Sequence, residues 1–390
     1  MILDRYENFL AERRAEGLER CLRWSSSPEA GWVEVAGKRL LNLSGNDYLG
    51  LSRHPLLLQR AREWGERWGT GSGASRLVTG NLELFRQVEE PLAALHGSAT
   101  ALIFNSGFQA NSGILPALLD AQVLGAMPLV FSDRLVHASI HQGCRAAGVR
   151  QLRYRHNDMN HLEHLLSAHA HLPGPRFILT ESLFSMEGDV APMGDLLALK
   201  ERFGAFLYLD EAHAVGVMGR EGRGVSCDHG GQVDLILGTF GKALGSFGAY
   251  VACSEKVRQY LINRSNAFIY STALPPTVLG SMSAALELLP ALEEERQHLM
   301  TTSGWLRQAL RQQGWDTAAS CSQIIPVITQ TPQQAMTMSQ RLQEEGILGV
   351  AIRPPTVPTS RLRLSLSALH QTEQLQPLLA ILSTMQEEGA

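Results

Sequence analysis

The chain has 390 residues, a formal net charge of −4 and a hydrophobic content of 44%. It is therefore long enough for two domains with a large buried core. The charge balance gives no indication of a nucleic-acid partner or an anionic membrane surface, and no apolar run approaches membrane-spanning length. Five scattered cysteines show neither metal-binding spacing nor a paired framework, which predicts a metal-free protein of the reducing cytoplasm.

Residues 1–45 are predicted to form an N-terminal helix and an arm. Acidic residues interleave the arginines of this stretch, so it is a poor match to a transit peptide. We expect a solvated amphipathic helix whose apolar side is formed by Ile2, Tyr6, Phe9 and Leu10.

Short apolar runs alternate with helix-like stretches through the predicted large domain, residues 46–283. Strands that alternate with helices imply crossover connections and a mostly parallel sheet. The sequence therefore predicts an α/β domain on a seven-stranded sheet. The expected strands are Ala101–Phe104, Pro128–Ser132, Val149–Arg153, Arg176–Thr180, Ala205–Leu209, Asp234–Gly238 and Gly248–Ala252.

The pattern changes after Pro275 and Pro276. A long helical stretch, Thr277–Gln313, is followed by short strands and a further helix. This mixture predicts a small α+β C-terminal domain over residues 284–390. Its expected strands are Gln323–Ile328, Leu348–Ile352 and Arg361–Leu366.

One strand-to-helix turn is a candidate phosphate site. The strand that ends at Phe104 is followed by Asn105-Ser106-Gly107-Phe108, which opens an apolar helix-like segment. A helix N-terminus offers free N–H groups and the positive end of the helix dipole, and a glycine allows close approach of the backbone. Most turns of this kind bind nothing. Thr239 supports the interpretation of this turn as a phosphate site, because its hydroxyl could reach the same phosphate.

A carboxylate follows another buried strand. The run Phe206–Leu209 leads directly into Asp210, and ligands of open α/β sheets bind beyond the carboxyl ends of the strands. A carboxylate there can keep the pyridine nitrogen of pyridoxal phosphate protonated, and His213 can flank the same ring. The alternative for Asp210 is a helix N-cap after a strand.

Lys242 is one of only four lysines, and it lies in a glycine-rich, charge-free stretch directly after the apolar run Leu235–Leu237. Desolvation disfavours the ammonium form, and a neutral amine is a nucleophile toward aldehydes. The alternative is a lysine in a flexible surface loop. A strand ending in Asp-x-x-His, followed about thirty residues later by a strand ending in Thr-x-x-Lys, favours a lysine that carries pyridoxal phosphate.

Together the motifs resemble the α-oxoamine synthases, a family of fold-type-I pyridoxal-phosphate enzymes, over nearly the whole chain. Within the family, Ile352–Pro358 followed by Arg361–Leu364 most resembles the members that act in biotin synthesis. Glu187 is a conservative departure, because many members carry Asp there. The matching motifs are Asn46–Leu51, Gly71–Arg76, Ser132–Ser139, Glu181–Asp189, Asp210–His213 and Thr239–Lys242.

The resemblance implies a condensation of L-alanine with a pimeloyl thioester of coenzyme A or of acyl carrier protein, with loss of carbon dioxide. Lys242 would hold the cofactor and move the α-proton, and Asp210 would protonate the ring nitrogen. His137 would stack on the ring and touch the substrate; its alternative is a core histidine. The other cofactor contacts implied are Gly107, Phe108, Ser185, His213, Thr239 and Thr272, the last reaching the phosphate of the neighbouring subunit in a homodimer.

Carboxylate recognition is expected from Asn46, Arg20 and Arg353, since arginine binds carboxylates in a bidentate manner. Arg353 has the stronger support, because the two prolines that follow it stiffen its loop, and Thr356 lies in the same loop. A surface role is the alternative for Arg20, which has several arginines nearby.

Three other functions remain open. A member of the same family could use glycine with an acetyl, succinyl or long-chain acyl thioester. An aminotransferase on the same fold would convert the cofactor to its amine form with an amino acid alone. A non-catalytic sensor domain would follow a DNA-binding module, for which the motif at Asn46 begins too early.

Overall fold

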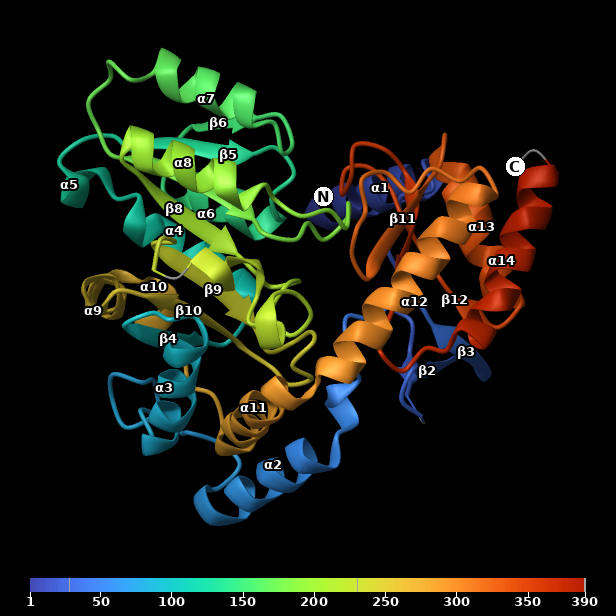
Figure 1. The fold of residues 1–390 in the computed structure, drawn as a ribbon, viewed down its shortest axis with the longest axis horizontal. Helices are drawn as coiled ribbons and strands as arrows, with labels where there is room; N and C mark the ends of the chain where they lie inside the picture. The colour runs from blue at the N-terminus through green and yellow to red at the C-terminus, as the bar shows by residue number, and fades with distance from the viewer. Residues whose placement is uncertain (28, 230, 389–390) are drawn as a thin grey trace.

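The computed structural model describes residues 1–27, 29–229 and 231–388, which form two lobes joined by a long helix (Figure 1). The larger lobe contains a seven-stranded sheet in the order β4-β10-β9-β8-β7-β5-β6. Strand β10 pairs antiparallel with β4 and β9, and the other neighbours are parallel. The predicted fold class, α/β with a mostly parallel seven-stranded sheet, is confirmed.

All seven predicted strands of this sheet are present, with ends within two residues of their expected positions. Every residue of β9 and β10 is buried, which explains why these strands are continuous apolar runs without polar alternation. The strands are β4 (Thr100–Phe104), β5 (Leu129–Asp133), β6 (Gln151–Tyr154), β7 (Arg176–Glu181), β8 (Ala205–Asp210), β9 (Leu235–Thr239) and β10 (Ala249–Cys253).

Helices flank the sheet and cover its edge at β4 (Figure 1). Several begin at a side-chain cap, as where Ser106, Asp158 and Ser254 accept backbone N–H bonds. The helices of this lobe are α2 (Pro55–Trp68), α3 (Arg86–Leu95), α4 (Gly107–Leu118), α5 (Ala121–Leu124), α6 (Ala138–Ala146), α7 (Met159–Ala168), α8 (Met193–Phe203), α9 (Glu255–Arg264), α10 (Asn266–Ile269) and α11 (Pro276–Leu288).

The helical stretch expected over Thr277–Gln313 is two helices instead of one. Helix α11 ends at Leu288, a short 3-10 turn follows, and α12 (Glu293–Gln312) leads into the second lobe. Pro290 lies in that turn and has no N–H to continue the helical hydrogen bonds.

The second lobe combines two small sheets with helices α13 (Pro332–Glu344) and α14 (Thr372–Glu387). One sheet has the order β11-β14-β13, and the other has the order β1-β2-β3-β12. Strands from the N-terminal residues therefore share a sheet with β12, to which β3 is parallel. The strands are β1 (Ser25–Ser26), β2 (Trp32–Val35), β3 (Lys38–Asn42), β11 (Ile324–Ile328), β12 (Ile347–Leu348), β13 (Val350–Ile352) and β14 (Arg361–Ser365).

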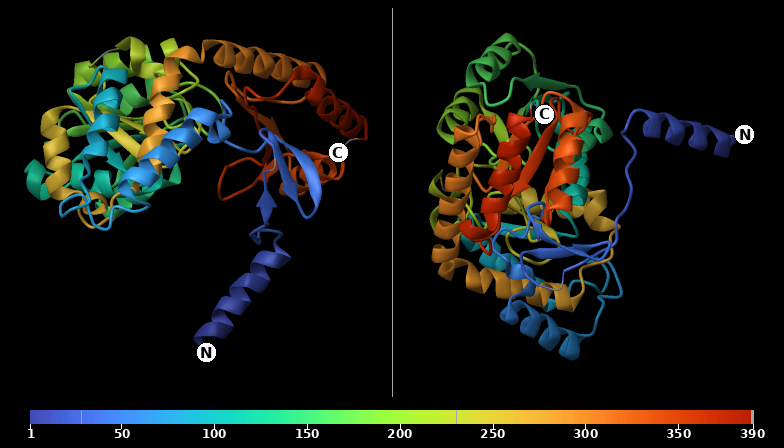
Figure 2. Two further views of the ribbon diagram at one scale, coloured as in Figure 1. Left: turned by 90° about the horizontal axis from the view of Figure 1, so that it is seen from below. Right: turned by 90° about the vertical axis from the view of Figure 1, so that its right-hand side faces the viewer.

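The predicted N-terminal helix is present as α1 (Ile2–Ala15), which projects outward on the side of the second lobe (Figure 2). None of its residues is buried, and its apolar side chains are exposed. Within the described residues, the helices are too short or too polar to cross a membrane.

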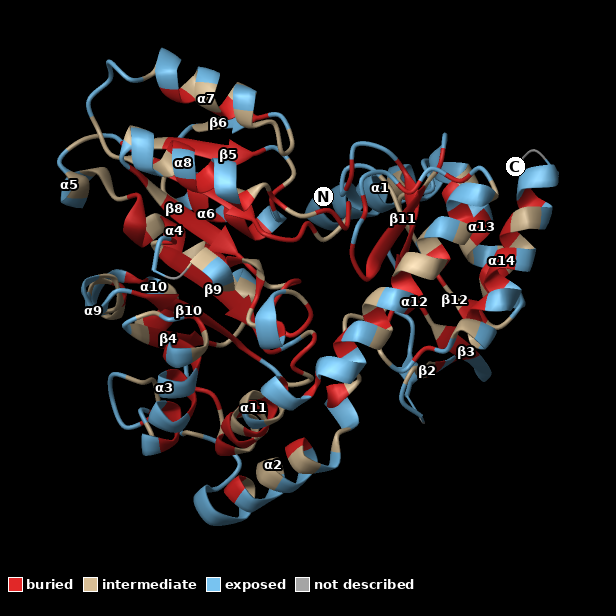
Figure 3. Cartoon of the chain, in the orientation of Figure 1, coloured by how far each residue is buried: buried red, intermediate tan, exposed pale blue. Residues whose placement is uncertain are grey.

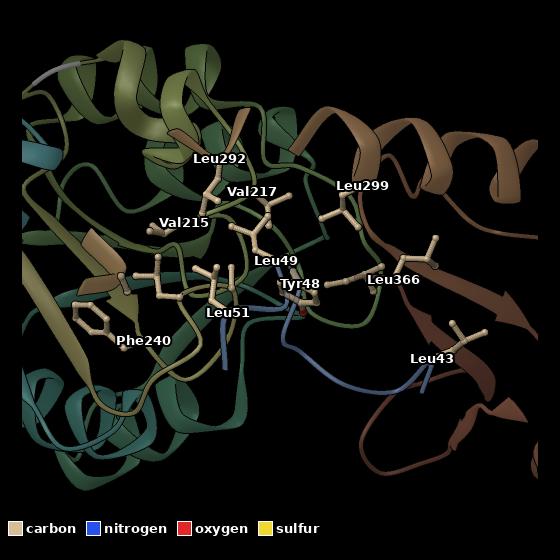
Figure 4. Close-up of a cluster of buried hydrophobic side chains, with 14 of the residues drawn as sticks. Leu43, Tyr48, Leu49, Leu51, Val215, Val217, Phe240, Leu292, Leu299 and Leu366 are labelled. Atoms are coloured by element: carbon tan, nitrogen blue, oxygen red, sulfur yellow. The ribbon is translucent and has the colours of Figure 1, made fainter. Parts of the chain in front are cut away.

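The core of the larger lobe is centred on its sheet, whose strands are almost entirely buried (Figure 3). A second apolar cluster lies where the segment Leu43–Leu51 passes between the lobes (Figure 4). It includes Phe240, two residues before Lys242, and Val215, two residues after His213. The cluster therefore supports the backbone that carries both of these polar residues.

Candidate active site

Chemically active side chains gather where the parallel strands of the large sheet end. Glu181 is the last residue of β7, Asp210 is the last of β8, and Lys242 follows the end of β9 by three residues. Carboxyl ends of neighbouring parallel strands meet at one edge, where open α/β sheets bind ligands. The sheet order thus brings together residues that are distant in the sequence.

Lys242 is half-buried, and the pKa of its amine is lower than that of an ordinary lysine. Burial lowers the pKa of Lys242 to about 8, the charges of Asp210 and Glu181 oppose this shift, and the charge of Arg363 adds to it. A lower pKa raises the fraction of neutral, nucleophilic amine near neutral pH. Lys242 therefore has the property expected of a lysine that reacts with an aldehyde, and it does not lie in a flexible surface loop.

Asp210 is buried and held by two donors. Asn111 Nδ2 donates to Asp210 Oδ2 at 3.0 Å, and the N–H of Ala212 donates to Asp210 Oδ1 at 3.0 Å. The hydroxyl of Tyr208 donates to Asn111 Oδ1 at 2.6 Å, which fixes the orientation of that amide. The chain turns after β8 without starting a helix, so Asp210 is not a helix cap. Asn111 was missed by the sequence reasoning, since it is an ordinary helix position.

His137 caps α6 and keeps an exposed side chain, so it is not a core histidine. Its Nδ1 accepts from the N–H of Ser139 at 3.3 Å, and its own N–H donates to Glu181 Oε1 at 2.6 Å. Desolvation lowers the pKa of His137, the charge of Asp210 opposes this, and Lys242 lowers it further. A neutral imidazole with an accessible face beside Asp210 can cover a flat ring.

The N-terminus of α4 is open and lies beside these groups. Ser106 accepts the N–H groups of Gln109 and Ala110, whereas no hydrogen bond within the described residues uses those of Gly107 and Phe108. A Cβ added to Gly107 would meet nothing within 4 Å. The Phe108 ring stands edge-on to His137 at 6.5 Å. Free N–H groups at an open helix end suit an anion such as phosphate.

Two threonines expected at the phosphate have different surroundings. Thr239 is buried, donates its hydroxyl to the carbonyl of Gly248 at 2.9 Å and accepts from the N–H of Gly241 at 3.2 Å. These bonds hold the turn that presents Lys242. Thr272 has an exposed side chain, and its carbonyl accepts from Asn105 Nδ2 at 2.9 Å, next to the α4 terminus.

His213 is buried, and its Nδ1 lies 2.7 Å from the hydroxyl of Tyr48. Burial lowers the pKa of His213 well below its ordinary value, and the charges of Lys242 and Arg363 act in the same direction. The imidazole is therefore neutral at physiological pH. The Tyr48 hydroxyl also donates to Asn46 Oδ1 at 3.1 Å, which links His213 to one of the predicted substrate residues.

Arg363 is the arginine that faces this group, and the sequence reasoning did not select it. It lies on β14 and donates to the carbonyl of Ser185 at 2.7 Å and to Asn46 Oδ1 at 3.4 Å. Its charge lowers the pKa of Lys242. The sequence does contain a pattern that points to Arg363: Arg361 and Arg363 alternate with leucines in an apolar strand. Two arginines on one face of a buried strand require partners.

Arg353, Arg20 and Thr356 line a separate pocket of about 470 Å³ between α1 and the loop after β13. Arg353 Nη1 donates to the carbonyl of Gly17 in the N-terminal arm. The pocket also contains apolar side chains, among them Phe9 and Leu10. The predicted substrate residues therefore divide into two groups. Asn46 and His137 lie at the sheet edge with Arg363 and Glu181, and Arg353, Arg20 and Thr356 line this pocket.

The edge of the large sheet fits pyridoxal phosphate. An amine of lowered pKa, Lys242, lies within the electrostatic reach of the buried carboxylate of Asp210, and the open end of α4 is joined to the same carboxylate through Asn111. A phosphate, a pyridine nitrogen and an aldehyde would each find a suitable partner here.

Comparisons with known proteins agree with this chemistry. Residues 38–382 match the family described as aminotransferase class I and II. An 8-amino-7-oxononanoate synthase from Gluconacetobacter diazotrophicus is 53% identical over 360 residues, covering 91% of this chain and 90% of that protein. A serine palmitoyltransferase structure from S. paucimobilis, with PLP and myriocin bound, has a TM-score of 0.91 at 28% identity and covers 98% of both chains.

A solved 8-amino-7-oxononanoate synthase from Francisella tularensis has a TM-score of 0.78 at 26% identity, covering 90% of this chain and 98% of that one. Both matches extend over most of the chain, and the family match includes all the residues described at the sheet edge. The chain therefore belongs to the class I and II aminotransferase family of pyridoxal-phosphate enzymes, within its α-oxoamine synthase branch.

Proposed function

We propose that the protein condenses L-alanine with a pimeloyl thioester, with loss of carbon dioxide, to give 8-amino-7-oxononanoate for biotin synthesis. The observation that carries this proposal is the lowered pKa of Lys242 among Asp210, Glu181 and Arg363. It occurs in a chain that is 53% identical to an 8-amino-7-oxononanoate synthase. That relative supplies the choice of substrates.

The cofactor, when bound, supplies an electron-accepting ring and an aldehyde carbon. Lys242 would hold the aldehyde of the cofactor, and its free amine would take the proton from the α-carbon of the amino acid. Asp210 would keep a proton at the ring nitrogen, and Asn111 Nδ2 holds the carboxylate in place at 3.0 Å. His137 would cover one face of the ring, and Ser185 and His213 would donate hydrogen bonds to its oxygen.

Arg363 and Asn46 are assigned to the carboxylate of alanine. Arg363 acts electrostatically on Lys242, where the amino acid must react, and one of its nitrogens lies 3.4 Å from Asn46 Oδ1. A guanidinium aligned there fixes the amino acid by two hydrogen bonds and orients its α-bonds relative to the ring. This assignment keeps Asn46, which the sequence predicts for carboxylate recognition, and proposes Arg363 in place of Arg353 and Arg20.

Arg353, Arg20 and Thr356 are assigned to the acyl substrate. Their pocket of about 470 Å³ combines charged groups with the apolar side chains of Phe9 and Leu10. A pimeloyl group has the same two features, because it is an apolar chain that ends in a carboxylate. The pocket therefore suits its distal end, whether the thioester is on coenzyme A or on acyl carrier protein.

We also propose that the protein works as a cytoplasmic homodimer. The exposed Thr272 lies beside the α4 terminus, and the large side chain of Tyr270, two residues earlier, is 80% accessible. A second copy covering this surface would bring Thr272 to the phosphate of its partner. The cysteines are unpaired within the described residues, which fits a reducing compartment.

Mass spectrometry of the product tests the proposed reaction. The purified, cofactor-loaded protein should convert alanine and a pimeloyl thioester to 8-amino-7-oxononanoate and release carbon dioxide. Glycine and serine, each with a pimeloyl or palmitoyl thioester, are the controls. Faster turnover of serine with the palmitoyl thioester would assign the protein to the other activity represented among its structural relatives.

Matched substitutions should separate the two arginine sites. Arg363→Lys keeps the charge but loses the forked geometry, so the alanine KM should rise by about 10- to 100-fold, or roughly 1.4 kcal/mol for each tenfold step. Arg353→Lys should instead raise the KM of the pimeloyl thioester and leave that of alanine within about twofold. Steady-state kinetics with each substrate varied in turn makes the measurement, and the opposite pattern would return carboxylate recognition to Arg353.

A further inference from the structure

A histidine outside the reaction site is held between two carboxylates. His156 follows β6, and its Nδ1 lies 3.1 Å from Asp133 Oδ1 while its Nε2 lies 2.9 Å from Asp189 Oδ2. Asp133 ends β5, and both carboxylates are buried. A carboxylate can only accept hydrogen bonds, so both ring nitrogens must carry a proton.

The charged form of this histidine is strongly favoured. Partial burial alone lowers the pKa of His156, but the hydrogen bonds and charges of Asp133 and Asp189 raise it to about 10. The ring also packs edge-on against Phe184, with the ring centroids 4.4 Å apart. His156 is therefore an imidazolium throughout the physiological pH range, and it neutralises one of the two buried negative charges.

The neighbouring residue strengthens the same connection. The backbone N–H of Asn157 donates to Asp133 Oδ2 at 2.8 Å, and its side-chain Nδ2 donates to Asp189 Oδ2 at 2.9 Å. Asn157 has φ of 50°, a left-handed conformation that asparagine tolerates better than most residues. This backbone geometry directs two donors at the two carboxylates that His156 joins.

Asp189 belongs to a loop that carries the site described above. In the loop Ser182–Val190, the carbonyl of Ser185 accepts from Arg363 Nε at 2.7 Å. Glu187 pairs with Arg361 at 3.0 Å. Arg361 lies two residues before Arg363, on the same face of β14. The loop therefore determines where both arginines of β14 can lie.

The far end of the loop is fixed to the second lobe. The carbonyl of Gly188 accepts from Ser322 Oγ at 2.8 Å and from the N–H of Cys321 at 3.0 Å. Gly188 has φ of 70°, and a Cβ at this position would lie 2.0 Å from the carbonyl oxygen of Ile324. The second lobe therefore packs closely against the loop at Gly188, and the hydrogen bonds of Asp189 attach the loop to His156 and Asn157 of the larger lobe.

We propose that His156 is a positioning residue: its imidazolium ties the loop Ser182–Val190 to the end of β5 and thereby directs the guanidinium of Arg363 toward Lys242. His156 touches neither substrate nor cofactor in this scheme. Its effect passes from Asp189 through the loop backbone to Ser185 and then to Arg363. The inference rests on the proposed function only in the choice of alanine as the amino acid.

Two variants test this role by kinetics of the cofactor-loaded enzyme. His156→Gln removes the charge, and Asp189→Asn keeps the ring but removes one carboxylate. Each should raise the alanine KM by about tenfold while kcat changes by less than about threefold, because Arg363 is misaligned but the reacting groups remain. His164→Gln, an exposed histidine on α7, is the matched control and should leave both constants unchanged.

A second readout requires no turnover. The chain has only four lysines, so 13Cε-lysine NMR of the full-length protein freed of cofactor gives few signals. A pH titration should place Lys242 near 8 in the wild type. In both variants the pKa should rise toward the ordinary value of lysine, because the charge of Arg363 is less well aligned.

A lower melting temperature with unchanged alanine KM and unchanged Lys242 pKa would overturn the proposal, since His156 would then act on stability alone. If His156→Gln does not fold, Asp189→Asn decides the question by the same two measurements. If the wild type uses glycine in place of alanine, the proposed function fails. The comparison of variants with glycine would still test His156.

Discussion

Lys242→Ala is expected to reduce turnover by at least about 10⁴-fold, because one side chain supplies both the attachment of the cofactor and the transfer of the α-proton. Burial lowers the pKa of Lys242 to about 8, and the other three lysines lie away from the strand ends that form the site. Borohydride treatment of the wild type should fix pyridoxal phosphate on Lys242. Peptide mapping measures the position of the adduct.

Lys256→Ala is the matched control, because Lys256 is exposed on α9. It should keep wild-type turnover and the adduct on Lys242. The variant without Lys242 should still bind alanine and the cofactor, but it should not exchange the α-proton of alanine with deuterium. An adduct on Lys38, Lys200 or Lys256 in the wild type would contradict the assignment.

Asp210→Asn is expected to lower kcat by roughly 10²- to 10⁴-fold, the range typical for removal of a positioned acid–base group. The amide cannot keep the ring nitrogen protonated. It also meets two donors, Asn111 Nδ2 and the N–H of Ala212, where the carboxylate accepted from both. One of these contacts would place two donors against each other, at a cost in stability of about 1–3 kcal/mol.

The two effects of Asp210→Asn can be measured separately. Thermal unfolding reports the loss of stability, and kcat of the folded, cofactor-loaded variant reports the chemical effect. Asp195→Asn, at an exposed carboxylate of α8, is the control and should change neither quantity by much. Near-normal kcat in folded Asp210→Asn would remove Asp210 from the mechanism.

The placement of Asn111 makes a graded comparison available. Its side chain joins Asp210, Ser139 and Tyr208 in one buried network. A substitution of Asn111 removes one hydrogen-bond donor to Asp210, so the carboxylate stays charged but is held less firmly. A substitution of Asp210 by Asn removes the charge itself. Comparison of the two variants therefore separates orientation of the carboxylate from its charge.

The strands of the large sheet and the candidate residues at their ends could be predicted because each follows a local pattern. Seven apolar runs alternate with helical stretches, and a strand buried on both faces must be apolar along its length. Asp210 and Lys242 each come shortly after such a run, so their position at the carboxyl edge of a sheet follows from the order of elements. The break between α11 and α12 was missed, although Pro290 marks it.

The sequence by itself determined the fold class and the positions of Lys242 and Asp210 just after buried strands, because those depend on residues close in the chain. Only the tertiary structure decided what surrounds them. Asn111 and Asp210 are 99 residues apart, and Arg363 and Ser185 are 178 apart. Such contacts depend on how strands are ordered and how the second lobe packs, and local hydrophobic patterns do not encode this. The same reason explains why the arginine facing Lys242 is Arg363 on β14, while Arg353, ten residues earlier, faces α1.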